Sequence, residues 1–140
     1  MQRPGLDTPI VWFYYDGIEK AAQFYGETLG FELVLDEGWA KIFEIAAGSF
    51  VGVVDGSSGK GHCQQAEDSA VLLTLVVDDV DRWRTYLEGA GVKIEGETRD
   101  IPVIDVRCFF FKDPGGYAIE IQKFTNPKTA QRFRLPSGNM

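Results

Sequence analysis

Apolar and polar positions follow the same order twice along this 140-residue chain. The segments 10–33 and 71–94 each begin with an apolar run, pass an aspartate, continue as an amphipathic stretch and reach a glycine before a second extended run. In this alignment Asp16 matches Asp78, and Gly30 meets Gly91 after a one-residue slip. Self-similarity of this kind predicts two duplicated supersecondary units, too few for a solenoid. We expect the two halves to enclose a space where function resides.

The first half predicts a β-α-β-β-β module at residues 8–55. Its helix should begin after Asp16, whose side-chain oxygen can cap the first turn, and should end at Gly30, which can adopt a left-handed conformation. Between them, apolar residues recur every three or four positions, namely Ile18, Ala21, Ala22, Tyr25 and Leu29. The apolar runs predict strands at 10–15, 31–35, 41–45 and 50–54.

The second half predicts the same module at residues 70–124. Asp78 or Asp79 should cap a helix that ends at Gly91, with Val80, Trp83, Leu87 and Ala90 on its inner face. Strands are expected at 71–77, 92–95, 103–111 and 117–124, the last two joined by the turn Asp113-Pro114-Gly115-Gly116. Residues 56–69, rich in glycine, serine and polar residues, form the expected linker. The tail 125–140 carries Lys128, Arg132 and Arg134 but no acid, and we expect it to be loosely attached or to contact a second copy.

Composition narrows the class of protein. With 44% hydrophobic and 25% charged residues, the chain is typical of one globular domain. Its net charge of −7 disfavours nucleic-acid binding and suits a neutral or cationic small molecule. No apolar run approaches the roughly 20 residues of a membrane span, and no signal peptide is evident, so we expect a cytoplasmic protein. The two cysteines, Cys63 and Cys108, are expected to be free thiols.

Two phrases carry a resemblance to a known family. The two segments are AAQFYGETLGFEL, which begins at Ala21, and KDPGGYAIEIQKF, which begins at Lys112. They resemble the vicinal oxygen chelate superfamily of glyoxalase I, extradiol dioxygenases, fosfomycin-resistance enzymes and bleomycin-resistance proteins. The resemblance covers roughly residues 8–124. It implies an α+β fold in which two paired β-α-β-β-β modules form a curved mixed sheet around a cavity. This fold hosts several activities, so it does not select one.

The resemblance also implies four metal-ligand positions, which fall on Ile10, near Gly52, on Leu72 and on Glu120. Only Glu120 carries a side chain that can coordinate an ion. Lewis-acid chemistry at a divalent metal needs two or three fixed protein ligands with an open position. We therefore expect no catalytic metal and no other cofactor. His62 beside Cys63 in the linker is too small a donor set to change this expectation.

Strand residues of equal parity share a face, which identifies the other side chains near these positions. The expected ligand-binding set is an aromatic cup with one acid at its base, made of Trp12, Tyr14, Phe50, Gly52, Leu72, Thr74, Cys108, Phe110 and Glu120. The resemblance, rather than parity, places Cys108 and Phe110 in this set. The same aromatic residues could instead fill a closed core. Gly52, which withdraws a side chain from the face, and Glu120, which is costly to bury alone, favour a pocket. An acid ringed by aromatic side chains suits a cation.

Three functions remain open. The first is a metal-independent small-molecule binding protein that resembles bleomycin-resistance proteins and sequesters a cationic or aromatic compound, as in antibiotic resistance. The second is a metal-free lyase or isomerase that uses Glu120 as general acid or base. The third is a structural or partner-binding module whose cavity is filled. We also expect a homodimer, with Trp39, Phe43 and the basic tail as contact material, and no nucleic-acid or membrane partner.

Overall fold

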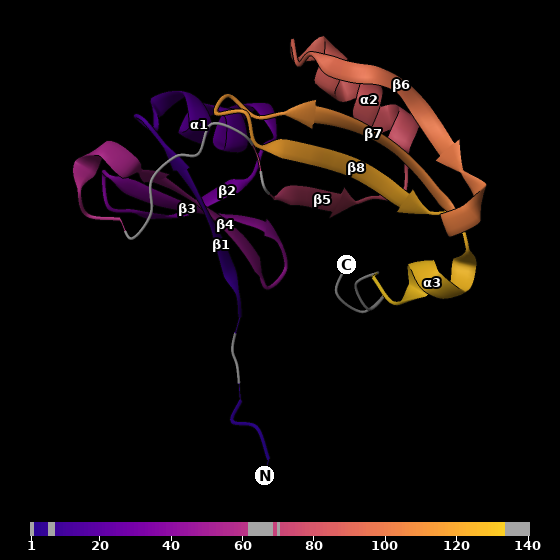
Figure 1. Cartoon of the computed structure of the whole chain (residues 1–140), viewed down its shortest axis with the longest axis horizontal. Coiled ribbons are helices and arrows are strands. Elements are labelled where there is room, and N and C mark those ends of the chain that lie inside the picture. The colour runs from indigo at the N-terminus through magenta and orange to yellow at the C-terminus, as the bar shows by residue number, and fades with distance from the viewer. Residues whose placement is uncertain (1, 6–7, 62–68, 70, 134–140) are drawn as a thin grey trace. The chain divides into compact units, whose positions relative to one another are not determined.

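The computed structural model describes residues 2–5, 8–61, 69 and 71–133, so the predicted His62–Cys63 pair lies outside the described residues. The chain divides into two compact units, residues 1–68 (module 1) and 69–140 (module 2). Each module holds one four-stranded mixed sheet with a helix beside it (Figure 1). The α+β class and the twofold β-α-β-β-β order predicted from the sequence are therefore confirmed. No helix among the described residues is long and apolar enough to cross a membrane.

Module 1 is built around a sheet with the strand order β1-β4-β3-β2. Its strands β1, β2, β3 and β4 cover Ile10–Tyr15, Glu32–Asp36, Ala40–Ala46 and Ser49–Asp55. β1 runs parallel to β4, whereas β4, β3 and β2 are antiparallel neighbours. The short 3₁₀ turn η2 (Gly56–Ser58) follows β4. All four strands lie within one or two residues of the predicted ranges.

The helix of module 1 differs from the predicted regular α-helix. An α-helical turn, α1 (Glu19–Gln23), passes directly into a π-helical turn, η1 (Phe24–Thr28). Phe24 and Tyr25 of this turn are both buried, and the Leu29 N–H donates to the Phe24 carbonyl, five residues earlier, at 2.9 Å. Gly30 ends the helix with φ +75°, as predicted. The predicted cap at Asp16 is wrong, because the N-cap position is Ile18, two residues later, and no side chain bonds it.

The core of module 1 lies between this helix and one face of the sheet. Tyr25 is fully buried, and its ring lies between 5.4 and 6.4 Å from the rings of the surrounding Phe13, Phe24, Phe31 and Phe43. Val51 and Val53 of β4 are also fully buried. Such a cluster stabilises the module through apolar burial and edge-to-face or offset ring contacts.

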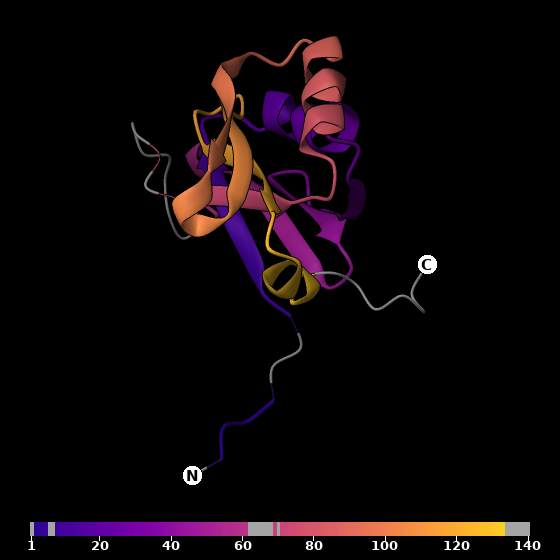
Figure 2. The same cartoon turned by 90° about the vertical axis from the view of Figure 1, so that its right-hand side faces the viewer.

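Module 2 has a sheet with the order β5-β8-β7-β6. Its strands β5, β6, β7 and β8 cover Leu72–Val76, Ile94–Ile101, Val106–Lys112 and Ala118–Phe124. Helix α2 (Val80–Gly89) is capped by Asp79, which accepts a hydrogen bond from the Arg82 N–H at 3.0 Å, one of the two predicted caps. The helix packs on β7 and β8 and lies on one side of these strands (Figure 2).

Two strands of module 2 differ from prediction. β6 continues six residues beyond the expected end, through a polar run whose pattern does not alternate. β7 begins three residues late, because Pro102–Ile104 form a 3₁₀ turn (η3) and Asp105 adopts a left-handed φ of 52°. In the tail, the short helix α3 (Pro127–Gln131) follows β8, and Phe133 stacks on Phe124 with ring centroids 4.7 Å apart. The tail is thus attached to its module at least as far as residue 133.

The turn between β7 and β8 is fixed by a buried carboxylate. Asp113 is 4% exposed, and one of its oxygens accepts hydrogen bonds from the N–H groups of Gly115 and Tyr117, each at 2.9 Å. Gly116 has φ +89°, which is why the predicted turn requires glycine at this position. The turn sets the antiparallel register that places Phe110 opposite Glu120.

Candidate functional site

Glu120 lies in the middle of β8 and is 6% exposed. One of its oxygens accepts a hydrogen bond from the Thr74 hydroxyl of β5 at 2.8 Å, and the other accepts one from the Gln122 amide at 3.3 Å. Both oxygens therefore have a hydrogen-bond partner within the sheet of module 2. No Lys or Arg of the described residues pairs with the carboxyl group, so its hydrogen-bond partners are neutral groups.

The register places Glu120 among the side chains predicted to share its face. Glu120 of β8 pairs with Thr74 of β5 on one side and with Phe110 of β7 on the other, so the three residues form one row across the sheet. The next row along the strands contains Gln122 of β8 and Cys108 of β7. Alternate residues of β7 and β8 face α2 instead, because the Arg84 guanidinium of α2 lies 5.7 Å from the centre of the Phe109 ring. We call the opposite side, with Thr74, Cys108, Phe110, Glu120 and Gln122, the Glu120 face.

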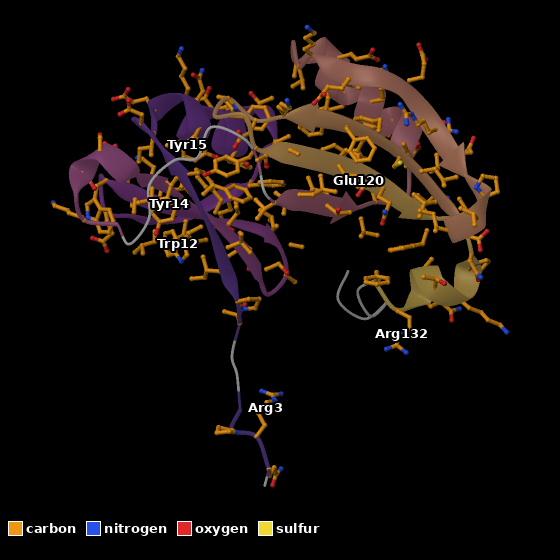
Figure 3. The ribbon with its side chains drawn as sticks, viewed as in Figure 1. Arg3, Trp12, Tyr14, Tyr15, Glu120 and Arg132 are labelled. Carbon is orange, nitrogen blue, oxygen red and sulfur yellow. The ribbon has the colours of Figure 1, made fainter. Side chains whose placement is uncertain are left out.

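The Glu120 face combines this acid with apolar surface. Leu72 and Val76 of β5 are 49% and 42% exposed, and Phe110 is half-buried. Figure 3 shows Glu120 projecting from its strand within module 2. Such a face can accept a hydrogen bond from a cationic or N–H group while packing against an apolar ligand body.

Glu120 affects the pKa of the neighbouring Cys108 thiol. The thiol is fully buried and free. Burial raises its pKa above the ordinary value, the negative charge of Glu120 and a hydrogen bond to that carboxylate raise it further, and Arg99 acts in the opposite direction. The folded state therefore holds the thiol proton more tightly than the unfolded chain. This favours folding below the unfolded thiol pKa of about 8.5 and is lost as the pH rises through the folded-state pKa.

Glu120→Gln should lower the pKa of Cys108, because it removes a negative charge and a strong acceptor beside the thiol. In a Cys63→Ser background, the pH profile of thiol alkylation should move to lower pH, with the variant more reactive than wild type near pH 8. Glu37→Gln, at an exposed position of module 1, is the matched control and should leave the profile in place. An unshifted or rising profile in Glu120→Gln would show that the carboxylate does not act on the thiol.

In module 1, the predicted residues Trp12, Tyr14, Phe50 and Gly52 share the face opposite the helix, and Figure 3 shows Trp12 and Tyr14 along β1. The interpretation of Gly52 as an open space for a ligand is wrong. A Cβ atom at Gly52 would collide with Cε3 of Trp12, so the indole ring occupies the space that glycine leaves. Tyr14 is likewise approached closely, since a Cβ at Gly61 would lie 2.8 Å from its ring.

Gly52→Ala should destabilise the protein by about 1–3 kcal/mol, because the added methyl group collides with the Trp12 ring. In a Trp12→Ala background the same change should be neutral or stabilising, since alanine costs less than glycine in a strand. Urea denaturation of the four proteins measures this coupling. Gly89→Ala, where a Cβ meets nothing within 4 Å, is the control. Additive effects in the double mutant would contradict the packing of Trp12 on Gly52.

Arg107 of β7 bonds Asp81 at 2.7 Å and Asp100 at 2.8 Å on the α2 side of the sheet, away from the Glu120 face. These ion pairs raise the pKa of the Arg107 guanidinium. Phe43, expected in a dimer contact, is 2% exposed and belongs to the core of module 1, so it offers no contact surface. Trp39 is half-buried, and the homodimer itself stays a prediction.

Sequence reasoning missed a hollow of about 570 Å³ in module 1. It lies beside α1 rather than on the face of Trp12, because Phe43, which packs against the helix, lines it. Asp55 at its edge accepts hydrogen bonds from the Ser57 hydroxyl and the Gly17 N–H, which lower the pKa of its carboxyl. The hollow is lined by Gly17, Ile18, Glu19, Ala22, Gln23, Glu27, Leu33, Gly38, Lys41, Phe43 and Asp55. No pattern in the sequence indicates it, since these residues come from five separate segments.

The fold agrees with comparisons to known proteins. Residues 10–121 match the family model described as the Glyoxalase/Bleomycin resistance protein/Dioxygenase superfamily, and the chain belongs to this superfamily. It is 30% identical over 115 residues to the uncharacterized protein YraH of Bacillus subtilis (strain 168), covering 75% of this chain and 88% of that relative.

Solved structures show the same fold. A glyoxalase/bleomycin resistance protein/dioxygenase from Nocardioides has a TM-score of 0.72 and 18% identity, over 91% of this chain and 87% of its own. A lactoylglutathione lyase from Agrobacterium tumefaciens has a TM-score of 0.69 and 19% identity, over 89% of this chain and 97% of its own. At these identities the likeness concerns the fold alone.

The divalent metal implied by the resemblance does not fit the residues present. Ile10, Gly52 and Leu72 offer no donor atoms at three of the four implied positions, so Glu120 is the one implied position with a coordinating side chain. Within the described ranges, no three His, Cys, Asp or Glu side chains gather as a metal site. We therefore derive no chemistry through a metal.

Proposed function

We propose that this protein binds a small molecule on the Glu120 face without a metal, with Glu120 accepting a hydrogen bond from a cationic nitrogen of the ligand. One observation carries the proposal: a carboxylate only 6% exposed, held by Thr74 and Gln122, with no ion pair to any described residue. Burying a charge without a counter-charge costs free energy, and a cationic ligand would offset that cost.

The apolar neighbours support a ligand with an aromatic or hydrocarbon body. Leu72 and Val76 expose apolar surface beside the carboxylate, and Phe110 lies in the same row as Glu120. Rings and aliphatic groups gain free energy by covering such surface. The chain's net charge of −7 also favours the approach of a cation.

A screen by NMR tests the proposal. Isotope-labelled protein is titrated with aromatic amines and with their uncharged analogues, in the presence of a chelator. The proposal expects shift changes centred on residues 72–76, 108–110 and 118–122 for the amines. Binding that requires an added metal, or shift changes confined to the hollow beside α1, would refute it.

A metal-free lyase or isomerase with Glu120 as general acid or base is the second candidate. It is favoured by the fixed orientation of the carboxylate, since proton transfer requires a catalytic group held at hydrogen-bond distance from the reacting atom. The likeness in fold to a lactoylglutathione lyase fits this candidate as well. Chelator-resistant turnover of a bound compound, abolished by Glu120→Gln while binding persists, would favour it over sequestration.

A further inference from the structure

Arg99 reaches the Glu120 face through an irregularity in β6. Glu95 pairs with Phe110, but the next pair along the ladder is Arg99 with Cys108, so four residues of β6 span two residues of β7. A bulge of this kind bends a strand and redirects its side chains. Without it, Glu97 would stand opposite Cys108, and the neighbouring charge would be negative instead of positive.

Helix α2 holds the bulge in place. The two terminal nitrogens of Arg84 donate to the Thr98 hydroxyl at 3.1 Å and to the Gly96 carbonyl at 3.0 Å. On the other side of Arg99, Asp100 accepts a hydrogen bond from Arg107 at 2.8 Å. Thr98 and Asp100 thus point toward α2, and strand alternation directs Arg99 to the opposite side, the Glu120 face.

The charge of Arg99 is available to a ligand. Arg84 and Arg107 each form ion pairs, whereas Arg99 forms none with any described residue. The positive charge of Arg99 acts on the Glu120 face, because it lowers the pKa of Cys108 whereas Glu120 raises it. The other charged residues on this face are Glu95, exposed in the next row, and Lys112, exposed at the end of β7.

We propose that Arg99 binds an anionic group of the same ligand whose cationic nitrogen meets Glu120, so that the ligand is a small bipolar compound with a carboxylate at one end and an amine at the other. This inference rests on the proposed function. β6 and β8 are two strand spacings apart, roughly 10 Å, and Arg99 stands one row along the strands from Glu120, in the row of Cys108 and Gln122. A rigid aromatic ring with an amine and a carboxylate at opposite ends matches this spacing.

Two probes test the inference: 4-(aminomethyl)benzoate, which carries both charges, and benzylamine, which carries only the cation. Wild-type protein should bind the bipolar probe about two- to fivefold more tightly, the range for an exposed ion pair. The preference should shrink at high salt. Arg99→Met should abolish the preference and leave benzylamine affinity unchanged, whereas the matched control Lys112→Met should keep it.

A second readout needs no ligand. In a Cys63→Ser background, Arg99→Met should raise the pKa of Cys108, opposite to the shift in Glu120→Gln. If both probes bind with equal affinity and benzylamine binding still depends on Glu120, the inference about Arg99 is wrong while the proposed function stands. Failure of both probes to bind, or binding indifferent to Glu120→Gln, would overturn the proposed function and this inference with it.

Discussion

Glu120→Gln should weaken a cationic aromatic ligand by roughly 1–3 kcal/mol, the range for losing a hydrogen bond to a charged group. The amide keeps the shape of the side chain but removes the negative charge that meets the ligand nitrogen. An uncharged ligand of the same shape should lose much less affinity. NMR or calorimetric titration of wild type and variant with benzylamine and toluene-like neutral analogues separates the two effects.

The same variant distinguishes a functional from a structural carboxylate. If Glu120 is retained for a ligand, its replacement should leave the free energy of unfolding unchanged or raise it, because an unpaired buried charge is removed. Thr74 and Gln122 are only half-buried and can turn to water. A loss of several kcal/mol in stability, with ligand affinity unaltered, would mean that Glu120 serves the fold.

Tyr25→Ala should lower the free energy of unfolding by about 3–5 kcal/mol, the range for truncating a large buried aromatic side chain. The ring is fully buried and contacts the rings of Phe13, Phe24, Phe31 and Phe43. Its loss would leave a cavity in the centre of module 1, beside the π turn.

Denaturant unfolding of Tyr25→Ala and of Tyr86→Ala measures this effect. Tyr86, on α2, is 49% exposed and touches Trp83 edge-on, so its removal should cost at most about 1 kcal/mol. Comparable losses for the two tyrosines would contradict the assignment of Tyr25 as the core of module 1.

The repeat of apolar runs allowed both modules to be predicted, because strands buried on one face alternate and helices ending at glycine leave local signals. Strand parity, counted from the positions that the resemblance implies, predicted that Thr74 and Glu120 share a side, and the resemblance placed Cys108 and Phe110 there as well. The observed register has all four on one side. Their role as ligand contacts stays a prediction. Strand parity could not show that the Trp12 ring packs on Gly52, because this contact depends on how the indole side chain of β1 is oriented over β4.

Arg99 could not be predicted from the sequence. It lies in a polar run without alternation, and its direction depends on a bulge that Arg84 holds from a helix 12 to 14 residues earlier in the chain. The π turn could not be predicted either, because its apolar residues also fit the three- and four-residue spacing of a regular α-helix. Long-range contacts of this kind determine the details that local periodicity leaves open.

A crystal structure of the wild-type protein with its tightest-binding aromatic amine would show whether Glu120 binds the ligand. We expect the ligand nitrogen at hydrogen-bond distance, about 2.7–3.2 Å, from an oxygen of Glu120, with no metal ion on that carboxylate. A metal ion coordinated by Glu120, or a ligand bound in the hollow beside α1 with the Glu120 face empty, would contradict it.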